Sequence, residues 1–368
     1  MPDQVLTRAI DTLCSGGSLT EDQAAEVLSE IMHGEVSEIQ IAGFLIALRT
    51  KGETVQELAG LARVMRELAA PVVLERADLL DTAGTGGGRS SFNVSTTAAL
   101  IAAGAGCAVA KHGNRSATSR SGSADLLEAL GARIDLPPRA VAACIDEAGF
   151  GFMFAPAHHQ ATRFVVPVRR ELAVRTIFNL LGPLTNPAGA RRQLIGVSDA
   201  RFLETMAGAL ARLGVDRALV VAGEDGLDEV SAATATQVVE VNGEELRRYV
   251  LHPRDVGIEP PARSASGDGG SAAADGPPGG TPEENAAVTR AILQREGSAA
   301  GVPAPGEALA LINAGAAIYA AGGADSIAEG VQAARAALAE GRAAGALERY
   351  VQASHSHVPA DGEGVLGR

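Results

Sequence analysis

The chain has 368 residues, enough for two or three ordinary domains, and acidic residues outnumber basic ones by 44 to 31, so the formal net charge is -13. This balance excludes a protein that binds nucleic acid or an acidic membrane along its whole surface, and no apolar run approaches the ~18 residues of a membrane-spanning helix. No secretory signal opens the chain, and three widely spaced cysteines, Cys14, Cys107 and Cys144, do not suit a disulfide framework, so we expect a reduced, soluble, cytoplasmic protein.

The first 70 residues carry helical patterns only. Helix-start signals recur at Thr20, Ser37 and Thr54, each with a Gln or Glu three residues later. The apolar residues that follow these starts recur with the helical period: Ala24, Val27, Leu28, Ile31 and Met32; then Ile41, Phe44, Leu45 and Leu48; then Leu58, Leu61, Met65 and Leu68. The sequence therefore predicts a small helical domain over residues 1–70.

The pattern changes at Pro71, where short aliphatic runs begin to alternate with Ala-rich helical stretches. We expect buried parallel strands with crossover helices, which make an α/β domain over residues 71–353. The expected strands are residues 72–74, 107–110, 194–197 and 218–222, with an antiparallel hairpin of 237–241 and 246–251 across Asn242-Gly243. Later segments are expected to form helices at 283–294, 307–321 and 326–340, a flexible surface loop at 260–282 and a disordered tail at 354–368.

One stretch of the chain differs in charge from the rest. Residues 82–124 contain no Asp or Glu, although acids are in excess overall. Arg89, Lys111, Arg115 and Arg120 fall inside this stretch. A surface that serves only solubility mixes both signs of charge, so we expect this one to receive an anion.

The same stretch opens with a Gly-rich turn. A predicted strand at 79–83 runs into Gly84-Thr85-Gly86-Gly87-Gly88, where backbone N–H groups can approach phosphate oxygens without obstruction from side chains. Asn93-Val94-Ser95-Thr96 then begins an Ala-rich helix, whose first N–H groups would face the same anion. An ordinary tight turn remains the alternative, and the pattern matches neither a Walker loop nor a dinucleotide fingerprint.

Three further polar clusters accompany this turn. The run from Lys111 to Ser116 follows a predicted strand and so lies at the ligand-binding edge of a parallel sheet. Arg169, Arg170 and Arg175 offer guanidinium groups that suit a planar carboxylate, although at least one of them must lie on a helix surface. Residues 224–229 place four carboxylates after a strand, which favours Mg²⁺, with a solvated turn as the alternative.

Together these motifs resemble one enzyme family. GTGG…NVST, KHGNRS…SGSADLLEALG, PVRREL..RTIFN.LGPL.NP and DGLDE, in this order and spacing, are similar to anthranilate phosphoribosyltransferase of tryptophan biosynthesis, over residues 5–353. The resemblance implies a helical domain, completed by helices near 164–182, on an α/β domain of nucleoside-phosphorylase class II type, and a homodimer through the helices. It implies transfer of the phosphoribosyl group of 5-phosphoribosyl 1-diphosphate (PRPP) to the amine of anthranilate, with Mg²⁺ and release of diphosphate. We expect no nucleic-acid or membrane partner.

The resemblance also assigns roles to residues of this chain. The implied PRPP contacts are Gly84, Gly87, Gly88, Ser91, Asn93, Val94, Ser95, Thr96, Lys111, His112, Gly113, Asn114, Arg115, Ser119 and Ser123. The implied anthranilate contacts are Gly84, Asn114, Arg169 and Pro183, and the implied metal contacts are Ser95, Asp228 and Glu229. No catalytic acid, base or nucleophile is expected, because diphosphate departure depends on positioning and electrostatics, with Lys111 and His112 nearby.

One departure from the family pattern stands out. The family has an Asp in the glycine loop, whereas this chain is one residue shorter there and has Gly88 and Arg89. If Arg89 points inward, we expect diphosphate to need less Mg²⁺ at this loop, and if it points to solvent, no such change. A pyrimidine nucleoside phosphorylase of the same fold and a non-catalytic regulator that binds a phosphorylated sugar stay open as alternatives.

Overall fold

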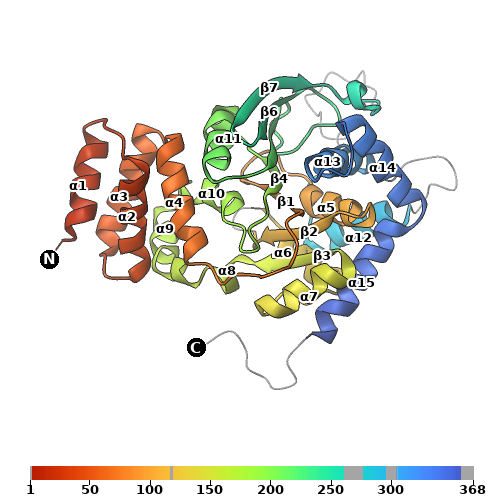
Figure 1. Ribbon diagram of the computed structural model, residues 1–368, viewed down its shortest axis with the longest axis horizontal. Helices are drawn as coiled ribbons and strands as arrows, with labels where there is room; N and C mark the ends of the chain where they lie inside the picture. Colours follow the sequence, from red (N-terminus) through yellow and green to blue (C-terminus); the bar gives the residue numbers. More distant parts are fainter. Residues whose placement is uncertain (1, 117–118, 261–276, 296–303, 305, 358–368) are drawn as a thin grey trace.

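The computed structural model describes residues 2–116, 119–260, 277–295, 304 and 306–357. A bundle of four helices occupies one end of the molecule, and a sheet covered by helices on both faces occupies the rest (Figure 1). Within the described ranges, no helix is long and apolar enough to cross a membrane.

The N-terminal bundle forms where the helix-start signals predict it. Its helices are α1 (Gln4–Cys14), α2 (Glu21–His33), α3 (Glu38–Lys51) and α4 (Val55–Glu67). Thr20 and Thr54 each make a complete capping box, whereas Ser37 caps α3 with its side chain alone, because Gln40 turns its amide toward the N-terminal segment. The residues predicted to face inward are buried except Leu68, which is 42% exposed because α4 ends one residue earlier.

Seven strands form one sheet in the order β3-β2-β1-β4-β5-β6-β7. They are β1 (Leu79–Gly84), β2 (Ala108–Gly113), β3 (Phe150–Phe154), β4 (Arg192–Gly196), β5 (Arg217–Gly223), β6 (Thr236–Asn242) and β7 (Glu245–Leu251). Strands β1 to β5 are parallel, and β6 and β7 form the predicted antiparallel hairpin at the edge. The strand order reverses between β1 and β4, so the crevice where sheets of this kind bind ligands lies at the carboxyl ends of these two strands.

Two strand predictions differ from the structure. Residues 72–74 form no strand: Val72 N donates to Pro187 O (3.1 Å) outside the sheet, and Val73 is 78% exposed. These residues instead belong to an extended connection between α4 and β1. Strand β3 was not predicted, because its run Phe150-Gly151-Phe152-Met153-Phe154 is aromatic rather than aliphatic, although it pairs with β2 over its whole length.

Helices on the two faces of the sheet build two cores. One core contains α5 (Val94–Gly104), α6 (Ser123–Ala129), α7 (Pro138–Ala148), α12 (Pro282–Gln294), α13 (Glu307–Ala320), α14 (Ile327–Ala339) and α15 (Arg342–Ser356). The other contains the N-terminal bundle with α9 (Val166–Leu172), α10 (Phe178–Leu181) and α11 (Leu203–Arg212). Leu194 and Leu219 point into the first core, and their neighbours Ile195 and Val220 into the second, as the alternation of strand side chains requires. The bundle therefore shares its core with one face of the sheet.

Short helical turns complete the connections. They are α8 (Ala155–His158), η1 (Gln160–Phe164), η2 (Gly182–Leu184), η3 (Ala200–Phe202) and η4 (Pro253–Val256). Arg66 of α4 joins the bundle to this part of the chain, because its Nε donates to Leu184 O (2.6 Å) and its Nη1 to Leu213 O (3.3 Å). Burial lowers the pKa of Arg66 to about 10, and these carbonyl groups replace the water that the guanidinium has lost.

The predicted loop and tail are only partly described. Residues 277–281 lie against the glycine-loop region, since a side chain at Gly279 would meet Ser91 O at 2.6 Å, so this end of the 260–282 segment is packed. The tail does not begin at residue 354, because α15 continues to Ser356 and Ser354 is fully buried, with its Oγ accepting from Arg133 N (3.0 Å). Residues 261–276 and 358–368 lie outside the described residues.

Candidate active site

The glycine loop lies at the carboxyl ends of β1 and β4. Thr85 N donates to Gly196 O (2.9 Å), and Ser198 N donates to Thr85 Oγ1 (3.3 Å), so the first residues after both strands are bonded together. Gly86 and Gly87 have positive φ values of 65° and 79°, which turn the chain sharply back. The sequence thus places its glycines at the switch point of the sheet.

Arg175 supports the glycine loop from outside. Its Nη1 donates to Gly86 O (2.8 Å) and Ser198 Oγ (3.0 Å), and its Nη2 donates to Thr85 O (3.3 Å). A side chain at Gly87 would lie 2.0 Å from Arg175 Nη1 and would displace that flexible guanidinium, while the φ of 79° favours glycine by itself. The sequence suggested Arg175 as a ligand of a carboxylate, but in the structure its guanidinium donates hydrogen bonds to the glycine loop.

The last two carboxyls of the acidic turn after β5 contact the glycine loop and the start of α5. Asp228 Oδ2 accepts from Gly86 N (2.9 Å), and the Glu229 carboxyl accepts from Ser95 N at the start of α5. Both side chains are half-buried at the crevice, whereas Glu224 is exposed, as the solvated alternative predicts. Burial raises the pKa of Asp228, and burial with the adjacent Asp228 charge raises the pKa of Glu229 well above its usual range. Two close carboxyls that resist ionisation together suit a cation.

Gly196 makes the approach of this turn to the sheet possible. A side chain at Gly196 would lie 1.7 Å from Asp228 O and 2.4 Å from its carbonyl carbon. A side chain at Gly84 would lie 2.6 Å from Asp228 Oδ2. The ends of β1 and β4 are therefore shaped to receive the backbone and the carboxyl of Asp228.

Arg89 lies against the acidic turn that follows β5. Its Nη2 lies 3.7 Å from Asp225 Oδ2, and its backbone N donates to Gly226 O (2.8 Å). Asp225 also accepts from Ser231 Oγ (2.7 Å) and Leu227 N (3.2 Å). Arg89 thus joins the shortened glycine loop to the acidic turn.

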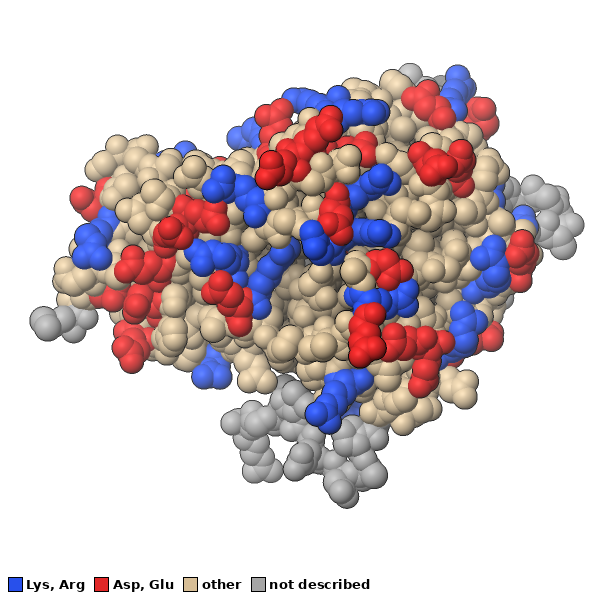
Figure 2. Space-filling model, viewed as in Figure 1, with Lys and Arg blue, Asp and Glu red and all other residues tan. Residues whose placement is uncertain are grey.

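The other two arginines of the acid-free stretch also contact carboxylates from elsewhere. Arg115 contacts Glu128 (2.5 Å) and Asp125 (2.8 Å), and Arg120 lies 3.6 Å from Glu284. On the face shown in Figure 2, Lys and Arg side chains gather across the middle of the molecule with acidic groups beside them. The excess positive charge of residues 82–124 is therefore largely compensated in space, so an anion here depends mainly on backbone N–H and hydroxyl groups.

Lys111 lies beneath the crevice floor. It is 2% exposed, and its Nζ donates to the Thr82 backbone carbonyl, to Thr82 Oγ1 (3.2 Å) and to Ser95 Oγ (3.4 Å). Burial lowers the pKa of Lys111, while the nearby Asp81 and Glu229 carboxyls oppose this shift. Its ammonium group is therefore bonded to Thr82 and Ser95 and is not exposed as a donor on the crevice surface.

A buried network that the sequence analysis missed holds His112. Asp81, fully buried in β1, accepts from His112 N (3.1 Å) and from Asn186 Nδ2 (2.7 Å), and Asn186 Nδ2 also donates to Ala110 O (2.8 Å). Burial raises the pKa of Asp81. His112 Nδ1 lies 3.2 Å from Gly182 O, which selects the tautomer with hydrogen on Nδ1. A polar residue inside a predicted strand, at Asp81, was the available signal.

The remaining predicted contacts surround the same crevice. Asn114 is exposed after β2, and its backbone carbonyl accepts from Ser123 Oγ (3.3 Å). Ser119 N donates to Ser116 Oγ (2.7 Å) in the next loop. The other predicted PRPP contacts lie at the end of β2, in the loop between β1 and α5, or at the start of α5: Gly88, Ser91, Asn93, Val94, Ser95, Thr96 and Gly113. Within the described residues, the buried atoms Thr96 Oγ1 and His112 Nε2 have no hydrogen-bond partner.

Two of the predicted anthranilate contacts, Arg169 and Pro183, lie in the segment from α9 to η2. Arg169 of α9 is half-buried, its guanidinium carbon lies 5.4 Å from the centre of the Phe178 ring, and burial lowers its pKa. Arg170 is exposed, as one arginine of this helix was expected to be. Pro183 is buried in η2, next to the carbonyl that contacts His112.

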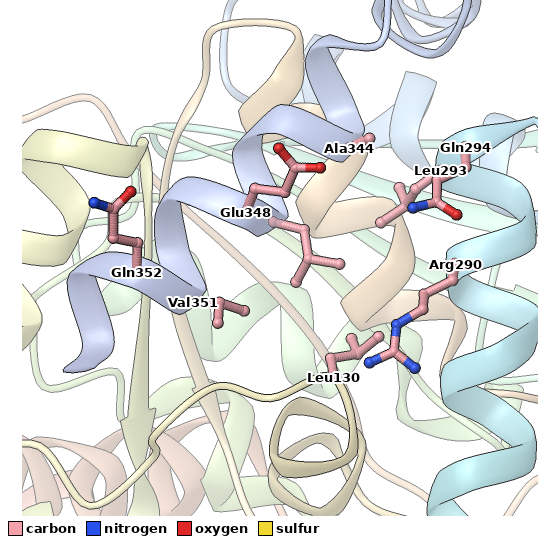
Figure 3. A pocket seen from close by; sticks show the side chains of 9 residues that line it. Leu130, Arg290, Leu293, Gln294, Ala344, Glu348, Val351 and Gln352 are labelled. Atoms are coloured by element: carbon pink, nitrogen blue, oxygen red, sulfur yellow. The ribbon is translucent and has the colours of Figure 1, made fainter.

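The pocket shown in Figure 3 lies elsewhere. It has a volume of about 320 Å³ between α12 and α15, and Leu130, Arg290, Leu293 and Leu347 are among its lining residues. None of its lining residues is a predicted site residue.

Comparisons with known proteins identify the family. The chain matches the glycosyl transferase family helical bundle domain over residues 7–69 and the glycosyl transferase family a/b domain over residues 76–344. It is 49% identical to anthranilate phosphoribosyltransferase of Rubrobacter xylanophilus, covering 95% of this chain and 98% of that relative, and 47% identical to that of Moorella thermoacetica, covering 94% and 98%.

Solved structures agree with these relatives. Anthranilate phosphoribosyltransferase from Thermus thermophilus matches with a TM-score of 0.84 and 48% identity, covering 94% of this chain and 99% of that one. The enzyme from Saccharomyces cerevisiae, in complex with PRPP and Mg, matches with a TM-score of 0.83 and 26% identity, covering 96% and 99%. With its helical bundle and α/β domain both matched over nearly their full length, the chain belongs to the anthranilate phosphoribosyltransferase family.

Proposed function

We propose that this protein transfers the phosphoribosyl group of PRPP to the amine of anthranilate, giving N-(5-phosphoribosyl)anthranilate and diphosphate. The observation that carries the proposal is the convergence of the glycine loop, the start of α5 and the Asp228–Glu229 pair at the switch point. N–H groups beside two carboxyls suit a sugar diphosphate bound with a divalent cation.

PRPP would lie across the glycine loop and the start of α5. We assign its contacts to Gly84, Gly87, Gly88, Ser91, Asn93, Val94, Ser95, Thr96, His112, Gly113, Asn114, Ser119 and Ser123. Lys111 would act through Ser95, to whose hydroxyl it donates, and Arg115 through its backbone, because its guanidinium is held by Glu128. The unpartnered Thr96 Oγ1 gives a bound phosphate group a further donor.

The acidic turn fits Mg²⁺. Asp228 and Glu229 supply two carboxyls, Ser95 a hydroxyl, and no group of three or more His, Cys, Asp or Glu side chains is poised for a metal within the described ranges. Mg²⁺ suits such a small donor set, since it keeps several waters and shares substrate phosphates. When bound, it would supply charge neutralisation for the departing diphosphate.

The chain's own residues would position the two reactants. The amine of anthranilate is neutral near pH 7, so its lone pair can form the bond to C1 of the ribose while the bond from C1 to the diphosphate oxygen breaks. The nitrogen then loses one proton to solvent, which gives the secondary amine of the product. Arg169 would bind the carboxylate of anthranilate, with Asn114, Gly84 and Pro183 around its ring. The N–H groups of the glycine loop would stabilise the charge that grows on the leaving group.

The test follows both products. Loss of anthranilate fluorescence and release of diphosphate should each require PRPP, anthranilate and Mg²⁺ together. A protein that consumes thymidine with phosphate instead would be the phosphorylase alternative. Binding of PRPP without turnover would indicate the non-catalytic regulator.

We also propose a homodimer through the bundle and a cytoplasmic location. Ile39 and Ile46 of α3 lie seven residues apart on one helix face and are 84% and 38% exposed, which favours a partner surface. The double variant Ile39→Glu with Ile46→Glu should sediment as a monomer, and a monomeric wild type would refute the dimer. Free Cys14, Cys107 and Cys144 agree with a reducing compartment, which cell fractionation tests.

A further inference from the structure

Asn285, near the start of α12, lies directly behind Asn93. Asn285 is 2% exposed, and its Nδ2 donates to Asn93 Oδ1 (2.7 Å). Asn93 is the residue before α5, but its side chain makes no capping hydrogen bond to that helix. The side chain is held instead by Asn285 and by the loop at Ser121, which are far from it in the sequence.

Backbone groups at both ends of this network fix the orientation of each amide. Gly280 N donates to Asn285 Oδ1 (2.9 Å), and because a backbone N–H can only donate, the Asn285 NH₂ must face Asn93. At the other end, Asn93 Nδ2 donates to Ser121 O (3.1 Å), which can only accept. Asn93 Oδ1 also lies 3.1 Å from Ser121 Oγ. Rotating either amide by 180° would place a donor against a donor and an acceptor against an acceptor.

This arrangement leaves one group of Asn93 for a ligand. Its oxygen is engaged by Asn285 and Ser121, and one N–H of its NH₂ is engaged by Ser121 O. The second N–H is the remaining hydrogen-bonding capacity of the half-buried side chain. Asn93 is therefore set to donate to an anion and not to accept from one.

Two further contacts keep α12 in register with this loop. Thr289 Oγ1, one turn after Asn285, lies 2.9 Å from Thr97 Oγ1, one turn after Asn93. A side chain at Gly279 would meet Ser90 Oγ at 2.5 Å, so the segment before α12 packs closely on the loop before Asn93. Asn285 thus belongs to a rigid wall behind the PRPP side of the crevice.

We propose that Asn285 is a positioning residue for PRPP, which holds the Asn93 amide so that its N–H faces the sugar diphosphate. The inference rests on the proposed function, since it requires Asn93 to contact PRPP. Asn285 acts only through Asn93. It therefore governs binding of PRPP and leaves the anthranilate side of the crevice unchanged.

The decisive variant is Asn285→Asp, which keeps the size of the side chain. Its carboxylate still accepts from Gly280 N but places an oxygen against Asn93 Oδ1. We expect the KM for PRPP and its calorimetric Kd to rise at least tenfold, with the KM for anthranilate within twofold of wild type. Protonation of Asp at this position restores a donor, so lowering the pH from 8 to 6 should recover part of the PRPP affinity in this variant only.

Two companion variants separate positioning from loosening of the helix. Thr289→Val removes the hydrogen bond between α12 and α5 without touching Asn93, so stability should fall while the KM for PRPP stays within twofold. Asn285→Ser, whose hydroxyl is too short to reach Asn93, should raise the KM for PRPP without the pH signature, and it serves as the test if Asn285→Asp does not fold.

The outcomes distinguish this inference from the proposed function. If wild type neither binds PRPP nor forms product, the proposed function fails and this inference with it. If wild type does both but neither Asn285 variant changes the KM for PRPP, only the positioning role is refuted. Equal losses for both substrates, or a Thr289→Val variant as impaired toward PRPP as Asn285→Asp, would likewise refute it.

Discussion

Gly196→Ala should displace the acidic turn from the glycine loop without removing any polar group of the site. Gly196 ends β4, and the added methyl would start 1.7 Å from Asp228 O, whereas side-chain carbons essentially never approach closer than 3.0 Å. The contact involves backbone, so no flexible side chain can swing away. The Asp228 backbone must retreat by more than an ångström, which breaks the 2.9 Å bond from Gly86 N to Asp228 Oδ2.

The magnitude follows from this displacement. Overpacking at a rigid backbone contact costs about 1–3 kcal/mol of folding stability, which leaves a domain of ordinary stability folded. A shift of about 1 Å in a positioning group costs on the order of 100-fold in turnover. We therefore expect kcat/KM for PRPP to fall about 100-fold, with a higher Mg²⁺ concentration for half-maximal activity, in a protein that still folds.

The measurements are urea unfolding, a Mg²⁺ titration of the fluorescence assay, and calorimetric binding of PRPP. Gly182→Ala is the matched control: its backbone is helical, nothing lies within 4 Å of the added methyl, and it should gain about 0.4–1 kcal/mol of stability. A Gly196→Ala protein with wild-type Mg²⁺ dependence and PRPP binding would show that the acidic turn does not need its observed position.

Three further outcomes test other parts of the site. Arg169→Ala should weaken use of anthranilate by about 1.5–3 kcal/mol with little change in PRPP affinity, and equal loss of both affinities in binding measurements would make Arg169 structural. Asp228→Asn combined with Glu229→Gln should raise the Mg²⁺ requirement and lower turnover while circular dichroism stays unchanged; an unaltered Mg²⁺ titration would remove the pair from the metal site. Burial lowers the pKa of His159 from 6.5 to about 4, so the unfolded chain alone takes up this proton as the pH falls between those values, and stability present above pH 6.5 is lost toward pH 4. Across that interval the free energy of unfolding of wild type should fall about 3 kcal/mol more than that of His159→Gln, and parallel urea curves would contradict this.

Local signals predicted much of the fold. A capping box, a helical period or a Gly-rich turn depends on residues within a few positions of each other, so Thr20, Thr54 and the glycine loop could be interpreted without knowing their neighbours in space. The same locality explains the errors. The extended run at 72–74 has strand-like side chains but no strand beside it, and Leu68 continues an apolar period after its helix has ended.

The distribution of charge along the sequence predicted the distribution of charge in the structure poorly. The acid-free stretch predicted a cationic surface that receives an anion. In the structure, however, Arg89, Arg115 and Arg120 contact carboxylates from other segments. Lys111, expected on the crevice surface, lies under it. Ion pairs form between whichever groups folding brings within a few ångströms, and their separation along the chain does not enter.

The sequence by itself determined the family, the class of fold and the approximate set of residues around the crevice, because its motifs follow strands whose carboxyl ends meet at one edge of a parallel sheet. Only the tertiary structure decided which groups support them. Arg175 holds the glycine loop across 89 residues, Asn186 holds Asp81 across 105, and Asn285 holds Asn93 across 192. The bundle likewise shares its core with one face of the sheet. Such contacts carry no local pattern, since they depend on the packing of elements that the chain forms far apart.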